Sequence, residues 1–205
     1  MSQMRLRKKR RAAMFTLIAF LALIVIERCY QSRELEIALK FGEPWEDMRQ
    51  RSSAKIAPAI AGKYWGRQTD SDARLRFMDD QYGFVTPEAR FFTITFERDG
   101  TVGNIRMSPQ IEPLLLDDTL KILLDLQEQW RNGGWRLMYP EESPPFADTP
   151  QWRAQLRDLE KNGGVTYWTA GDQYRVMLAV GRFHDDRYPT EERYLITLDL
   201  GRWLK

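Results

Sequence analysis

The sequence predicts an α+β domain, an antiparallel sheet packed by helices, preceded by one N-terminal transmembrane helix. Three observations predict it: a basic N-terminus followed by an uncharged apolar segment, later segments that alternate apolar and polar residues, and segments with helical periodicity. The chain has 205 residues. The part after the apolar segment, residues 31–205, is long enough for one ordinary domain.

The apolar segment, residues 12–26, is predicted to be the core of an uncleaved membrane anchor at residues 12–30. Six basic residues precede it within the first eleven positions, and it contains no charge. Fifteen residues of helix cover roughly 22 Å of a hydrocarbon core of about 30 Å, so Arg11 and Arg28 must snorkel toward the head groups. The residues expected to face lipid are Ala12, Phe15, Leu17, Phe20, Leu23 and Ile26.

Three other interpretations of this segment stay open. A cleaved signal peptide should end in small residues, whereas this segment ends in Ile26, Glu27 and Arg28. A lipoprotein would use Cys29, but Glu27 and Arg28 stand where small apolar residues are needed. A buried core helix of a soluble protein is the third. Under the anchor interpretation, the helix crosses the inner membrane. The basic tail, residues 1–11, then lies in the cytoplasm, and residues 31–205 lie in the periplasm.

Charge argues against nucleic acid as a partner. The net charge of +2 comes from 31 basic and 29 acidic residues, and six of the basic residues belong to the N-terminal tail. The body therefore has 25 basic and 29 acidic residues, a net charge of −4. The single cysteine cannot form an internal disulfide, so the fold must be held by its core.

The first half of the body is predicted to contain two helices and then three strands. Ser32 can cap a helix that runs to Phe41, and Pro44 suits the first turn of a second helix that ends near Ser53. Alternating residues predict strands at 73–78, 90–98 and 101–107, the last two joined by a turn at Asp99-Gly100.

The second half is predicted to begin with the longest helix of the domain. Leucines recurring three and four residues apart, with Trp130, predict a mostly buried helix at 116–132. A short strand at 135–139 and an exposed loop at 140–148 are expected to follow. A helix at 149–161 comes next, and strands at 165–169, 173–183 and 193–200 end the chain. The similar order of elements allows two related halves, 31–110 and 111–205, although no residues repeat at fixed spacing.

The residues predict no enzyme, metal or cofactor. His184 is the only histidine, and Asp185 and Asp186 follow it directly, which is typical of a solvated turn rather than a metal site. The sequence contains no C-x-x-C, H-E-x-x-H or phosphate-binding glycine motif. Paired acids at Asp117-Asp118, Glu141-Glu142 and Glu191-Glu192 could serve glycoside hydrolysis, but adjacent acids in loops and at helix starts are ordinarily solvated.

A protein partner is the better expectation, and two loops are candidates to contact it. Residues 140–148 and 185–192 combine aromatic and charged groups on irregular backbone. The candidate partner-binding residues are Glu141, Glu142, Phe146, Asp185, Asp186, Glu191 and Glu192. The excess of acids in the body would suit a basic partner, although solvated loops explain the same residues.

Five segments of the chain resemble a group of small inner-membrane-anchored periplasmic proteins of proteobacteria encoded beside type VI secretion lipase effectors. The segments are YGFVTPEARFFT (82–93), RMSPQIEPLLLDDTLKILLDLQEQWRNGGW (106–135), PPFADTPQWRAQLRD (144–158), GDQYRVML (171–178) and EERYLITLDL (191–200). Some members carry an automatic label of flagellar biosynthesis sigma factor. An acidic body beyond a membrane anchor does not fit that cytoplasmic, DNA-binding role.

The resemblance implies an immunity protein that binds and neutralises an incoming toxic lipase. Its partners would be the secreted toxin and, through the anchor, membrane lipid, with no nucleic acid and no small-molecule substrate. Two other functions stay open. One is a bitopic scaffold or assembly subunit of a cell-envelope machine, and the other is a periplasmic enzyme that depends on acids such as Asp117 or Glu142.

Overall fold

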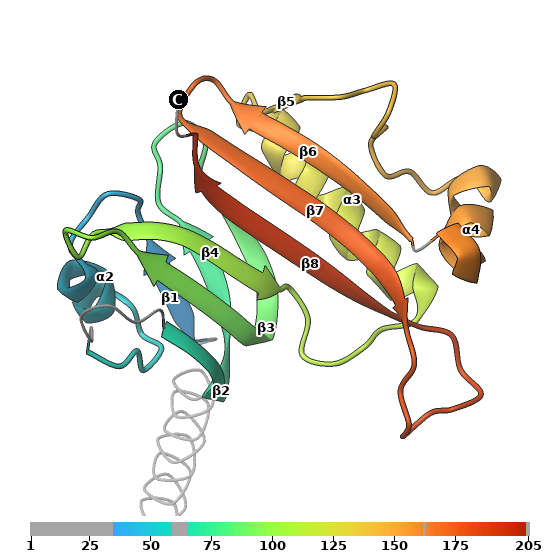
Figure 1. Cartoon of the computed structure of the whole chain (residues 1–205), viewed down its shortest axis with the longest axis horizontal. Helices are drawn as coiled ribbons and strands as arrows, with labels where there is room; N and C mark the ends of the chain where they lie inside the picture. Colours follow the sequence, from blue (N-terminus) through green and yellow to red (C-terminus); the bar gives the residue numbers. More distant parts are fainter. Residues whose placement is uncertain (1–34, 59–64, 162, 204–205) are drawn as a thin grey trace, which may run out of the picture. The chain divides into compact units, whose positions relative to one another are not determined.

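The computed structural model describes residues 35–58, 65–161 and 163–203, with side chains from 71 onward in the second range. These residues form an α+β domain around one eight-stranded mixed sheet, with the strand order β1-β2-β3-β4-β8-β7-β6-β5 (Figure 1). The strands are β1 (Glu36–Leu39), β2 (Trp65–Phe77), β3 (Phe84–Phe96), β4 (Val102–Ser108), β5 (Arg136–Leu137), β6 (Gly164–Ala170), β7 (Tyr174–Phe183) and β8 (Arg193–Arg202). The helices are α2 (Trp45–Arg51), α3 (Leu116–Asn132) and α4 (Pro150–Arg157), with a 3₁₀ turn at Leu159–Lys161.

The predicted α+β class is confirmed, with one correction to the sheet. All strand pairs are antiparallel except β1 and β2, which are parallel. The predicted anchor at 12–30, with its lipid-facing residues, lies outside the described residues. Within the described ranges, no helix has the length and apolar character needed to cross a membrane.

The first predicted helix is wrong, because residues 36–39 form strand β1. Leu35 and Leu39 are four apart, which fits one face of a helix, but with Ile37 they also alternate with period two. Ile37 and Leu39 pair with Leu75 and Phe77 of β2 and are fully buried. Pairing with β2 therefore decides between two patterns that the local sequence allows equally.

The outer edge of β1 is covered by the end of α2. The backbone N–H groups of Glu36 and Ala38 donate to the hydroxyls of Ser53 and Ser52, at 2.8 and 3.0 Å. The Ala38 carbonyl accepts from Arg51 at 2.9 Å. These side chains satisfy backbone groups that an uncovered edge strand would offer to another chain.

Glu36 also fastens β1 to β2 through two arginines. Its carboxylate accepts from Arg76 at 2.7 Å and from Arg74 at 3.1 Å. The hydrogen bond from Arg76 is the main cause of a lowered pKa for Glu36; burial opposes it, and Arg74 adds to it. Since the folded-state pKa lies below the ordinary 4.5, this stabilisation is present above pH 4.5 and is lost as pH falls through the folded value.

We therefore expect Glu36→Gln to lower the free energy of unfolding at pH 7 by up to about 1 kcal/mol, because the pair is partly exposed to solvent. The difference between Glu36→Gln and the wild type should shrink as the pH falls below the folded-state pKa. Urea unfolding at a series of pH values measures this. Glu128→Gln, an exposed change on α3, is the control, and an equal loss in the control at pH 7 would contradict the assignment.

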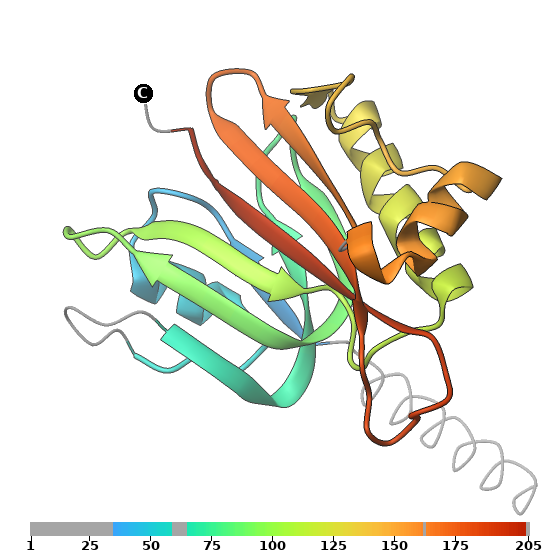
Figure 2. The same ribbon diagram turned by 45° about the vertical axis from the view of Figure 1, so that its right-hand side comes forward.

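Helix α3 covers one side of the sheet, as the sequence predicts, and its bounds match the prediction. Four of its five leucines and Trp130 are buried. They face strands whose core residues pair across the sheet: Phe92 with Met107, Met107 with Leu198, and Leu198 with Leu178. Figures 1 and 2 show α3 running across one side of β6, β7 and β8. This side of the sheet is the hydrophobic core, and each buried leucine contributes roughly 1.5–3 kcal/mol.

The other predicted elements are found with shifted ends. The expected helix at 149–161 ends at Arg157, because Asp158 is extended and a separate 3₁₀ turn follows. Thr149 caps α4 by accepting from the N–H of Trp152 at 3.3 Å. The strand expected at 135–139 keeps only two residues.

The two halves of the chain contribute successive halves of one sheet. Strands β1 to β4 and β8 to β5 meet at the antiparallel pair of β4 and β8. The edge pairs differ, since β1 is parallel to β2 whereas β5 is antiparallel to β6. Descent of 31–110 and 111–205 from one repeated unit remains a prediction.

Candidate protein-binding face

Strands β6, β7, β8 and β4 have a second side, opposite α3, that no helix of the described residues covers (Figure 2). Directly paired residues share a side of an antiparallel sheet. One row across it is Tyr167, Met177, Asp199 and Arg106. We define the open face by twelve residues of this side, leaving out its glycines and the outer ends of β7 and β8: Asn104, Arg106, Arg136, Val165, Tyr167, Thr169, Arg175, Met177, Ala179, Leu195, Thr197 and Asp199. All of them are half-buried or exposed.

A pocket of about 510 Å³ opens on this face. We call it the tyrosine–methionine pocket after Met138, Tyr139, Tyr167 and Met177, which line it together with Arg175 and Asp199. The rings of Tyr139 and Tyr167 meet edge to face, with centroids 6.0 Å apart, and Tyr139 is 48% exposed. Methionine adapts its shape and tyrosine combines apolar area with a hydroxyl, so the pocket suits a protruding apolar side chain.

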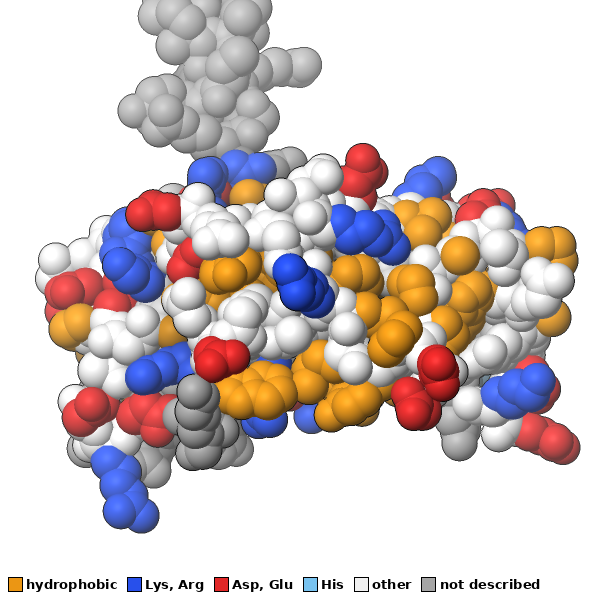
Figure 3. Space-filling view, turned by 90° about the horizontal axis from the view of Figure 1, so that it is seen from above, with side chains coloured by type: hydrophobic (Ala, Val, Ile, Leu, Met, Phe, Trp, Pro, Cys, Tyr) orange, Lys and Arg blue, Asp and Glu red, His pale blue; other side chains and the backbone are white. Residues whose placement is uncertain are grey.

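A second hollow of about 550 Å³ lies on the same strands, next to α4. Its floor includes small residues such as Ala179 and Thr197, and Glu142 and Lys161 stand at its rim. Because both hollows are floored by β6, β7 and β8, the open face offers an uneven surface with apolar depressions and charged rims. Figure 3 shows the same mixture on another side of the domain, where hydrophobic groups are interrupted by single charged side chains.

Three arginines of the open face differ from most other arginines of the domain. Arg106, Arg136 and Arg175 are exposed, and their guanidinium groups form no ion pair or hydrogen bond within the part of the chain that the structure describes. By contrast, ten arginines elsewhere lie within 4.0 Å of a carboxylate: 49, 51, 74, 76, 90, 153, 157, 182, 187 and 193. Three arginines without an ion pair therefore lie where the sheet is uncovered, although the described residues include others elsewhere, such as Arg98 and Arg202, that form none.

The first predicted loop reaches the rim of this face, but the expectation of an exposed Phe146 is wrong. Glu141 and Glu142 are exposed. Phe146 is 1% exposed and its ring lies 4.9 Å from that of Trp152. Its backbone N–H and carbonyl bond the side-chain amide of Gln127, at 2.8 and 2.9 Å. Phe146 thus holds the loop down, and a partner can reach Glu142 but not Phe146.

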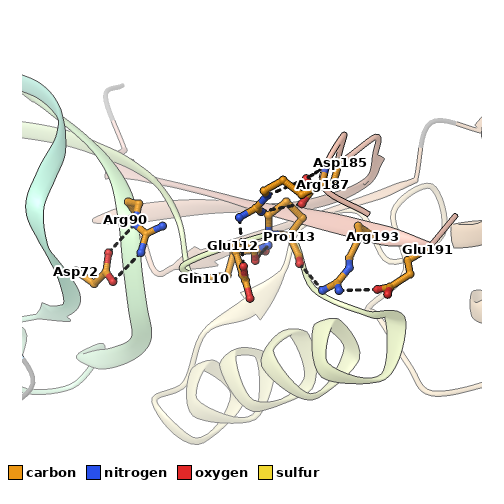
Figure 4. Close-up of polar contacts among 9 residues, drawn as sticks. All are labelled: Asp72, Arg90, Gln110, Glu112, Pro113, Asp185, Arg187, Glu191 and Arg193. Atoms are coloured by element: carbon orange, nitrogen blue, oxygen red, sulfur yellow. Dashed lines mark hydrogen bonds and ion pairs between the residues drawn. The ribbon is translucent and has the colours of Figure 1, made fainter. Parts of the chain in front are cut away.

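The second predicted loop is largely neutralised by its own arginines (Figure 4). Asp185 is 6% exposed and accepts from Arg187 at 2.7 and 2.9 Å, and Glu191 pairs with Arg193. The side-chain hydrogen bonds of Arg187 lower the pKa of Asp185. Glu192 pairs with Arg157 of α4 at 3.2 Å. Asp186 is the one of the four acids without an arginine partner among the described residues, and its side chain is 97% exposed, 3.2 Å from His184.

The loop and the start of β8 are both tied to the segment between β4 and α3. From the loop, Arg187 lies 3.5 Å from Glu112 (Figure 4). The Gln110 amide donates to the carbonyl of Tyr194 and accepts from the N–H of Ile196, at 2.9 and 2.8 Å. Arg193 donates to the carbonyl of Pro113 at 3.1 Å (Figure 4). The contact role predicted for Asp185, Asp186, Glu191 and Glu192 remains a prediction. The ion pairs that Asp185, Glu191 and Glu192 form with arginines reduce the charge available to attract a basic partner.

The groups considered for catalysis are distributed over the surface. His184 is exposed and lies 3.2 Å from Asp186. Asp117 pairs with Arg153 and Asp118 with Lys121. Among the described residues, no three potential metal ligands are grouped together.

A third cavity, of about 650 Å³, lies at the β2–β3 turn, away from the open face. Its carboxylate, Asp79, accepts from the N–H groups of Gln81 and Tyr82 and from the hydroxyl of Tyr174. Burial would raise the pKa of Asp79, but these hydrogen bonds lower it overall. Burial and Asp79 together raise the pKa of Tyr174 to about 12. Asp79 therefore stabilises the β2–β3 turn.

Comparison of the chain with family models, curated proteins and solved structures found no match. The proposed function therefore rests on the residues of the chain and on the resemblance of its five segments. The open face could not be found from sequence alone, since its residues come from five strands whose register must be known. The alternation within β7 and β8 was the only local signal.

Proposed function

We propose that this chain is a membrane-anchored periplasmic binding protein, an immunity protein that holds a type VI secretion toxin of the lipase type through the open face. The observation that carries the proposal is the contrast between the two sides of one sheet. One side is buried under α3, whereas the other exposes tyrosines, methionines and unpaired arginines around a pocket.

The composition of the open face supports a protein partner. Tyrosine, methionine and arginine are enriched at protein interfaces, where a few large side chains supply most of the binding energy. A pocket beside these side chains offers the partner a site for an anchoring residue. Tyr167, Met177 and Asp199 form one half-buried row on paired strands. Their backbone is already ordered, so binding loses little conformational entropy.

The proposed anchor would hold the inhibitor at the membrane surface, where a lipase toxin acts. A lipase toxin that enters the periplasm must act at the membrane surface. Tethering the inhibitor through residues 12–30 raises its effective concentration at that surface. Inhibition then needs only tight binding, and no chemistry by the chain itself.

Co-expression with the lipase effector of the same gene cluster, directed to the periplasm, tests the proposal. The full chain should restore growth, and a chain lacking residues 1–30 but carrying a cleavable signal should restore it less well. Met177→Glu, on the open face, should abolish rescue, whereas Leu159→Glu, 68% exposed on the 3₁₀ turn, should not. Absence of rescue by the full chain would contradict the proposal, and a secretion or motility defect without any toxin would favour an envelope scaffold.

A further inference from the structure

We infer that the open face recognises an acidic surface of its protein partner, with one apolar side chain of the partner seated in the tyrosine–methionine pocket. The inference rests on the proposed function and specifies the chemistry of the partner. It runs against the mildly acidic body of the chain, which alone would suggest a basic partner.

The charge of the open face is the first support. Its charged residues are Arg106, Arg136, Arg175 and Asp199, a net charge of +2, within a body whose net charge is −4. One carboxylate oxygen of Asp199 already accepts a hydrogen bond from the Asn104 amide, at 2.7 Å. The face therefore presents positive charge on a domain that is otherwise slightly acidic.

The geometry of the arginines is the second support. Arg136 and Arg175 both pair with Thr169 of β6, so they flank one residue of the open face. Arg175 also lines the pocket, next to Met177. A guanidinium binds a carboxylate through two parallel hydrogen bonds, and such pairs fix orientation as well as adding affinity. Carboxylates around an apolar anchor would thus meet arginines around an apolar pocket.

Two other occupants fit the face less well. A second copy of the chain, related by a two-fold axis, would present the same patch to itself and would place arginines near arginines. An anionic membrane would attract the arginines, but it would also bring Asp199 to a negative surface and leave a pocket of about 510 Å³ without a protruding group to fill it.

Binding of the full chain, in detergent micelles, to the purified lipase effector tests the inference. The wild-type complex is measured first by calorimetry, then a variant with Arg106→Glu, Arg136→Glu and Arg175→Glu. We expect the Kd to rise by about 100-fold or more. The wild-type Kd should rise with salt, and the variant should lose that dependence.

A control variant makes the same change in net charge away from the open face. Lys40, Lys55 and Arg98 are exposed, and their reversal to glutamate should change the Kd by less than about threefold. A third variant, with lysine at the three open-face positions, keeps the charge but loses the paired hydrogen bonds, and it should bind with intermediate affinity. Circular dichroism confirms that each variant is folded.

The outcomes are distinguishable. No binding by the wild type would overturn the proposed function and this inference with it. Wild-type binding that the open-face reversal leaves unchanged, or weakens no more than the control reversal does, would overturn the inference alone. The inference alone would also be overturned if phosphatidylglycerol nanodiscs without lipase protect the three arginines from an arginine-modifying reagent. That result would assign the face to lipid. Protection by the lipase alone, with the expected loss on reversal, would support it.

Discussion

Trp130→Ala should lower the free energy of unfolding by about 3–5 kcal/mol. Trp130 is fully buried on α3 and contacts the rings of Phe84, Trp168 and Trp135, with centroids 5.6, 5.7 and 6.1 Å away. Alanine would remove these contacts and leave a cavity between α3 and the sheet. The loss should be large because the rigid strands on either side cannot close that cavity.

Denaturant unfolding of the full chain in micelles measures this loss. Trp130→Phe should cost less, since the indole N–H has no hydrogen-bond partner among the described residues and its removal leaves no group unsatisfied. Met177→Ala on the open face should cost less than about 1.5 kcal/mol, because Met177 is only half-buried. Equal losses for Trp130→Ala and Met177→Ala would contradict the assignment of one buried and one open side.

Gly163→Ala should lower the free energy of unfolding by about as much as Trp130→Ala, about 3 kcal/mol or more. The residue has φ +85°, a left-handed conformation that costs other residues roughly 1–2 kcal/mol. A Cβ there would also overlap the carbonyl oxygen of Val180 and lie 2.9 Å from the Cα of Gly181. Both neighbours are backbone atoms of β7, so the start of β6 would have to move away from its partner strand.

Gly100→Ala is the matched control. Gly100 has φ +82° in the β3–β4 turn, but a Cβ there would have no atom within 4 Å. It should therefore cost only the conformational term, about 1 kcal/mol. Thermal unfolding compares the two variants. If Gly163→Ala lowers Tm no more than Gly100→Ala does, the close approach of residue 163 to β7 is wrong. Since Gly163 also lines the second hollow of the open face, partner binding should weaken in parallel.

The elements that the sequence predicted well are those whose patterns extend over many residues. Helix α3 has leucines and Trp130 three or four residues apart from 116 to 130, with acids at its start and glycines at its end, so this pattern fits a helix and not a strand. Segment 35–39 is too short for that, because its apolar residues fit a helix and a strand equally. Only the pairing of Ile37 with Leu75, 38 residues away, decides the matter.

The candidate site was harder to predict than the fold. Phe146 reads as an exposed loop residue until the side chain of Gln127, 19 residues earlier, is seen to bind its backbone. The acids of 185–192 read as free charge until their arginines are placed. The tyrosine–methionine pocket needs Tyr139 from a loop beside Tyr167 and Met177 from two strands, a contact that depends on sheet register.

Side-chain footprinting of the full chain with and without bound lipase effector tests the binding face most directly. Hydroxyl radicals modify methionine and tyrosine readily, and the domain has both on the open face and elsewhere. Binding should protect Tyr139, Tyr167 and Met177, while Tyr188, 38% exposed in the 184–192 loop, should keep its reactivity. Protection of Tyr188 with full reactivity at Met177 would place the interface on the loop and contradict the open face as the binding site.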